Sequence, residues 1–162
     1  PLSRLTRVNK NLLLLAKIEN SQFGDLENVD FLVLLNKSVD LLHDYIEERN
    51  IKFEKQIGDF ETVSCNKFLA ETLVNNLLSN AIRHTPVGES ITVKLFNRVL
   101  IVSNSGKHKL EEKALFKRFS ISTTATTNSG LGLAIVKEIC KQNGWTISYE
   151  FENSTHFFSI RF

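Results

Sequence analysis

The stretch "NNLLSNAIRHTP", residues 75–86, sets three asparagines into an otherwise amphipathic helix. On a helical wheel with about 100° per residue, Asn76, Asn80 and Arg83 share one side. The apolar positions gather around Val74 on the opposite side: Ala70, Leu73, Leu77, Leu78, Ala81 and Ile82. Asparagine forms helices poorly because its side chain competes for backbone hydrogen bonds. The polar stripe is therefore either a solvated outer face or a row of amide oxygens in a cleft, where Mg²⁺ accepts such ligands beside phosphate oxygens.

A second motif, "NSGLGLAIVKEIC" at residues 128–140, places Gly130 and Gly132 directly before a predicted helix. Glycine lets the backbone approach a ligand closely. The start of the helix directs free amide groups and the positive end of its dipole toward an anion such as phosphate. Alone, the motif also fits an ordinary turn, and it matches neither the Rossmann fingerprint nor the P-loop.

Composition limits the class of protein. The chain has 162 residues, 42% of them hydrophobic and 23% charged, which suits one compact domain with a short extra element. The net charge of +2, with basic residues scattered, indicates no nucleic-acid partner and no direct membrane contact. The longest apolar run, residues 12–16, is far shorter than the roughly 20 residues of a membrane span. We therefore expect a cytoplasmic chain, with membrane attachment through upstream segments left open.

The cysteines, Cys65 and Cys140, lack metal or redox spacing and are predicted to be reduced core thiols. Apolar residues recur every three or four positions from 1 to 20, which predicts a helix that packs against helices, of this chain or a second one. Further helices are expected at 31–49 (capped by Asp30), 66–85, 110–119 and 130–144, with strands at 27–29, 51–57, 62–64, 90–96, 98–105 and a hairpin at 146–162. The predicted fold class is α+β: a two-layer α/β sandwich, with one mixed, mainly antiparallel sheet, helices on one face and a single preceding N-terminal helix.

The order of the motifs resembles that of a known family. The asparagine helix is followed by "VSNSG" (102–106), "LFKRF" (115–119), "GLGLAIVK" (130–137) and a final hairpin. This order resembles the catalytic, ATP-binding domain of sensor histidine kinases, in the GHKL superfamily with the Bergerat fold. The resemblance implies a catalytic domain at 27–162. Residues 1–22 resemble part of the second helix of the dimerisation and histidine-phosphotransfer hairpin.

The resemblance also implies roles for particular residues. Asn76, Asn80 and Arg83 match the catalytic positions: Asn80 is the implied Mg²⁺ ligand, while Asn76 and Arg83 face the phosphates. His84 matches the aromatic position beside the nucleotide. The remaining positions that match nucleotide-binding motifs are Asn104, Gly106, Phe119, Ser129, Gly130, Leu131, Gly132 and Leu133.

Several positions depart from the family pattern. Asn104 replaces an aspartate that accepts a hydrogen bond from adenine; its amide oxygen can still accept, but adenine selectivity is expected to weaken. The second glycine of that motif is replaced near His108, and the usual glycine-threonine pair of the last hairpin is replaced near Thr155 and His156. Both histidines are predicted to lie on the surface. The segment 120–129, rich in serine and threonine, is expected to be a lid that is mobile without nucleotide.

The implied function is transfer of the γ-phosphoryl group of ATP, with Mg²⁺, to a histidine upstream of this fragment. None of the four histidines here stands in the H-[ED]-x-x-x-P context of a phosphoacceptor. The implied partners are the chain's own upstream phosphoacceptor helix, the receiver domain of a response regulator and a second copy in a full-length homodimer. Two alternatives stay open: a degenerate nucleotide-binding or dimerisation scaffold, and the same fold with a serine acceptor or a mechanical ATPase cycle. The mechanical ATPase cycle ranks low because gyrase-type ATPases place a catalytic glutamate where Asn76 stands.

Overall fold

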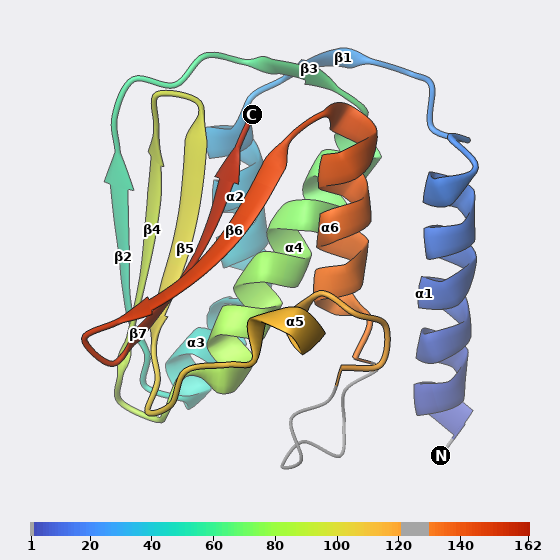
Figure 1. The fold of residues 1–162 in the computed structure, drawn as a ribbon. Coiled ribbons are helices and arrows are strands. Elements are labelled where there is room, and N and C mark those ends of the chain that lie inside the picture. Colours follow the sequence, from blue (N-terminus) through green and yellow to red (C-terminus); the bar gives the residue numbers. More distant parts are fainter. Residues whose placement is uncertain (1, 121–129) are drawn as a thin grey trace.

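A computed structural model describes residues 2–120 and 130–162. One five-stranded sheet lies against a layer of helices, and α1 stands on the outer side of that layer (Figure 1). The strands run in the order β2 (Lys52–Ile57), β4 (Ser90–Phe96), β5 (Val99–Ser105), β7 (Thr155–Arg161) and β6 (Thr146–Glu152). The helices are α1 (Leu2–Glu19), α2 (Phe31–Leu41), α3 (His43–Glu48), α4 (Lys67–His84), α5 (Glu112–Leu115) and α6 (Gly132–Asn143).

The predicted fold class is confirmed, including the mixed sheet. β2 pairs parallel with β4, and the other neighbours pair antiparallel. Two features differ from the expectation. β1 (Glu27–Val29) and β3 (Val63–Cys65) pair with each other in a separate two-stranded sheet. The single helix expected at 31–49 is divided at Leu42, where the amide bonds to the carbonyls of both Ser38 and Val39 and tightens the last turn of α2.

The core lies between the helices and one face of the sheet. Along β4, buried and half-buried residues alternate, as expected for a strand with one face against the core. Both predicted hairpins close through two residues with positive φ, at Asn97–Arg98 and at Asn153–Ser154, a conformation that matches the twist of paired strands. Cys65 and Cys140 are buried free thiols, as predicted.

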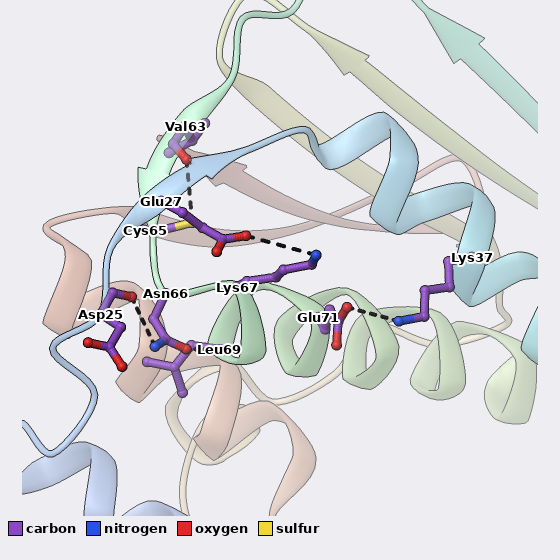
Figure 2. A network of polar contacts seen from close by, with 9 residues as sticks. All are labelled: Asp25, Glu27, Lys37, Val63, Cys65, Asn66, Lys67, Leu69 and Glu71. Atoms are coloured by element: carbon purple, nitrogen blue, oxygen red, sulfur yellow. Dashed lines mark hydrogen bonds and ion pairs between the residues drawn. The ribbon is translucent and has the colours of Figure 1, made fainter.

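The start of α4 is fixed by a capping residue (Figure 2). Asn66 accepts a hydrogen bond from the amide of Leu69 at 3.1 Å and donates one to the carbonyl of Asp25, also at 3.1 Å. A cap of this kind stabilises a helix by about 1 kcal/mol. The neighbouring ion pair between Lys37 and Glu71 is largely exposed and adds little. Because the cap links α4 to the segment before β1, it fixes the residue at which the asparagine helix begins.

The N-terminal helix α1 packs against α6 with Leu15 and Ile18, which are buried. The predicted packing of this helix against another helix is thereby confirmed. Glu19 forms an ion pair with Arg118, and Ser21 donates a hydrogen bond to Gln142 at 3.0 Å. Within the described parts of the chain, no helix is both long enough and apolar enough to cross a bilayer.

Candidate functional site

A cavity of about 780 Å³ opens between α4, the start of α6 and the ends of β5 and β7. Its walls include most of the residues singled out from the sequence. These are Asn76, Asn80, Arg83, His84, Asn104, Gly106, Gly130, Gly132 and Leu133. Segments that are far apart in the sequence therefore meet at one site.

Three predicted residues are not found at this wall. The Leu131 side chain is fully buried in the core, where it packs with the helices. Phe119 does not line the cavity: it has a positive φ of 59°, and 53% of it is exposed. Ser129 lies outside the described residues, as does the predicted lid from residue 121 onward.

The asparagine helix and the glycine motif face each other directly. The Asn76 carboxamide donates to the carbonyl of Thr72 at 2.8 Å, one turn earlier in α4, which satisfies its amide group within the helix. Its oxygen Oδ1 is directed at α6, because a Cβ added at Gly132 would lie 2.9 Å from that oxygen. Glycine at 132 thus permits the close approach of the two helices at the cavity.

Asn80 presents a carboxamide to the same cavity. Among the described residues, none forms a hydrogen bond with that carboxamide, so its oxygen is available to a ligand. Across the same described ranges, no group of three or more His, Cys, Asp or Glu side chains could hold a metal ion by itself. One neutral oxygen ligand fits Mg²⁺, which keeps several waters and takes its other ligands from substrate phosphates.

The start of α6 has the geometry of an anion site. Gly130 has a φ of +65°, a conformation that favours glycine. Leu131 occupies the N-cap without a side-chain hydrogen bond to the helix, and the first intrahelical bond joins the amide of Ile135 to its carbonyl at 2.9 Å. The amides between these residues have no partner within the helix, and the positive end of the helix dipole adds to their attraction for an anion.

The cavity wall carries more positive than negative charge. Of the residues that the structure describes, Arg7, Arg83 and Lys107 line it together with a single carboxylate, Glu111. Burial, and then repulsion by Arg7, lowers the pKa of Arg83, but an arginine remains cationic in proteins. Burial also lowers the pKa of His84, with smaller contributions led by Arg83. A cavity with this balance of charge attracts a polyanion.

Some lining residues were missed or misjudged from the sequence. Arg7 and Asn11 reach the cavity from α1, and their own helix gives no local signal for it. The surface position predicted for His156 is wrong: it is buried and lines the cavity, because β7 alternates and directs residues 156, 158 and 160 toward the helices. His108 is exposed as predicted, although it also borders the cavity.

Comparison with known proteins identifies the class to which this site belongs. Residues 66–162 match the family described as histidine kinase-, DNA gyrase B- and HSP90-like ATPases. The match includes more than half of the chain, and the chain belongs to this family. Membership implies that the chain binds ATP.

The individual relatives belong to a narrower class of protein than the family as a whole. The sensor histidine kinase HprS of Escherichia coli (strain K12) is 30% identical over 98% of this chain and 36% of its own length. The sensor protein QseC of Salmonella typhi is 29% identical over 91% of this chain and 34% of its own length. The chain thus spans about a third of the length of these curated relatives.

Solved structures with a similar fold also include histidine kinases. The histidine kinase AdeS of Acinetobacter baumannii superposes with a TM-score of 0.80 at 26% identity, covering 99% of this chain and 78% of that one. The catalytic domain of the histidine kinase ThkA gives 0.71 at 26% identity, covering 85% and 94%.

Proposed function

We propose that this chain is the ATP-binding catalytic part of a two-component sensor histidine kinase, and that it transfers the γ-phosphoryl group of ATP to a histidine on a segment preceding Pro1. The observation that carries the proposal is the convergence of Asn76, Asn80 and Gly132 on one cavity that Arg83 also lines. The named relatives, all sensor proteins or histidine kinases, support the choice among the family's activities.

The residues act mainly by positioning and by neutralising charge, as phosphoryl transfer requires. The carboxamide of Asn80 would hold Mg²⁺, which would offset the negative charge of the phosphates. Arg83 stabilises the charge that develops as the phosphoryl group leaves. The free amides at the start of α6 bind the end of the triphosphate chain, and Asn76 fixes the distance between α4 and α6.

We further infer a division into residues 1–22, part of a dimerisation and phosphotransfer hairpin, and residues 27–162, the catalytic domain. Support comes from α1, which leaves Leu5 and Leu13 exposed at 70% and 58%, as expected of a helix that packs against a second chain in a homodimer. The proposed phosphate acceptor beyond the histidine is a response regulator receiver domain. The solved ThkA structure in complex with the response regulator protein TrrA is an example in a protein of this fold. ATP and such partners support a cytoplasmic location for the chain.

The binding step is tested by calorimetry with Mg²⁺ and a non-hydrolysable ATP analogue. We expect saturable binding, weakened by about tenfold or more in Asn80→Asp because the new carboxylate repels phosphate oxygens. Asn75→Asp is the matched control: it introduces the same charge on the same helix, at a residue that does not line the cavity. Absence of binding at millimolar analogue would instead favour the scaffold alternative.

The transfer step is tested with γ-labelled ATP. This chain extended at its N-terminus by the preceding residues of its gene should become labelled on histidine, and Asn80→Asp should abolish the label while Asn75→Asp retains it. Labelling that is undiminished in Asn80→Asp, or that appears on serine, contradicts the proposed mechanism.

A further inference from the structure

His156 lies at the end of the cavity formed by β5 and β7. It sits directly opposite Asn104 in the antiparallel register, and both residues are buried while bordering the cavity. A Cβ added at Gly106 would overlap the imidazole Nε2 atom. The ring of His156 is therefore seated against the backbone of the glycine motif.

A chain of hydrogen bonds connects this imidazole to Tyr149 and Leu110. The amide of Leu110 donates to the hydroxyl of Tyr149 at 2.9 Å, and that hydroxyl lies 2.9 Å from Nδ1 of His156. The tyrosine oxygen already accepts from Leu110, so we assign its own proton to the bond with Nδ1, and the neutral imidazole then carries its proton on Nε2. Burial lowers the pKa of His156 and raises that of Tyr149, which favours the neutral ring and the protonated phenol.

Asn104 supplies the complementary group. Its Nδ2 donates to the carbonyl of Ser105 at 3.1 Å, so the amide is oriented by the backbone. Within the described ranges, no hydrogen bond reaches Oδ1 of Asn104 or Nε2 of His156. The cavity wall thus presents an acceptor and a donor from residues that face each other across two paired strands.

We propose that His156 determines base specificity: its Nε2–H donates to N1 of adenine while Oδ1 of Asn104 accepts from the exocyclic amine. The proposal rests on the ATP-binding function proposed above. Guanine presents the reverse pattern, with an acceptor at O6 and a donor at N1, and it would place like groups against each other. The replacement at Asn104, expected from the sequence to weaken adenine selectivity, is compensated by the histidine held by Tyr149.

The test compares ATP with 1-deaza-ATP, in which a CH group replaces N1, by calorimetry in the presence of Mg²⁺. The unmodified chain should bind 1-deaza-ATP about 10- to 100-fold more weakly than ATP, since the buried donor is left without a partner, and GTP more than about 100-fold more weakly. In His156→Phe, which keeps a ring of similar shape, ATP and 1-deaza-ATP should bind equally. His43→Phe, at an exposed position on α3, should preserve the difference.

The possible results separate this proposal from the one on which it rests. If the unmodified chain binds ATP and 1-deaza-ATP with the same affinity, the role of His156 is overturned while the nucleotide site stands; this comparison requires no variant to fold. If the difference persists in folded His156→Phe, another group contacts N1 and the assignment to His156 is wrong. If the chain binds neither nucleotide, the proposed ATP-binding function itself fails.

Discussion

Replacing Gly132 with alanine tests whether the close approach of α4 and α6 builds the site. The added Cβ would lie 2.9 Å from Oδ1 of Asn76, closer than a side-chain carbon normally comes to an oxygen. The Asn76 side chain must then rotate away and lose its 2.8 Å hydrogen bond to Thr72, at a cost of about 0.5–1.5 kcal/mol. Alanine in a helix gains up to about 1 kcal/mol over glycine, so the free energy of unfolding should change by no more than about 1.5 kcal/mol.

Nucleotide binding should change far more than stability. A displaced Asn76 no longer fixes the distance between α4 and the free amides of α6, and the loss of one hydrogen bond from those amides to a charged ligand costs about 1.5–3 kcal/mol, which corresponds to a Kd raised about 10- to 150-fold. Calorimetry with Mg²⁺ and a non-hydrolysable ATP analogue measures the Kd, and urea unfolding measures stability. Gly24→Ala is the matched control, because a Cβ there meets no atom within 4 Å.

A second substitution makes the test specific to the contact. In an Asn76→Ala background the oxygen is absent, so adding Gly132→Ala should weaken binding no further. The reasoning is refuted if folded Gly132→Ala binds the analogue within twofold of the unmodified chain, or if its effect is the same in both backgrounds.

Three further predictions concern charge, pH and thiol chemistry. Arg83→Gln should weaken binding of the ATP analogue about tenfold or more, since a hydrogen bond to a charged group is lost, yet leave the Kd for adenosine unchanged when both are titrated by calorimetry. His84 and His156 have lowered pKa values in the folded state. The unfolded chain therefore binds protons first as pH falls below about 6.5, and stability should decrease there; urea midpoints at pH 7.5 and 5.5 measure the decrease, which the double variant to Gln should reduce. Burial raises the pKa of Cys65 to about 11 and that of Cys140 to about 12, so neither should react with a thiol reagent at pH 8 until urea unfolds the chain; rapid labelling of the folded protein would contradict this.

Local sequence patterns predicted the structure correctly where residues close together in the sequence determine it. The wheel around Val74 separated the buried face of α4 from the face that carries Asn76 and Asn80, because burial follows the helical period. The asparagines at 97 and 153 marked the two hairpins, since this residue tolerates positive φ. The inward direction of the His156 side chain could also have been predicted, because the alternation along its strand continues to Phe158 and Ile160.

Contacts between segments that are distant in the sequence could not be predicted from local patterns. The pairing of β1 with β3, and the parallel pairing of β2 with β4, depend on where the intervening helices bring the strands. Arg7 lines the cavity only because α1 docks on α6, and no spacing within α1 encodes that contact. Phe119 was assigned to the site by resemblance to a motif, whereas its side chain is exposed in the structure.

The place of β7 in the sheet has a consequence for biosynthesis. It is made after β2, β4, β5 and β6, yet it lies between β5 and β6. While the ribosome has not yet delivered this strand, the edges of β5 and β6 expose unpaired amides and carbonyls that can recruit other nascent chains. Residues 156 and 158 complete the cavity from β7, so the polypeptide acquires its pocket only at the end of translation of this region, and a chaperone that shields the open edges until then would raise the yield of native molecules.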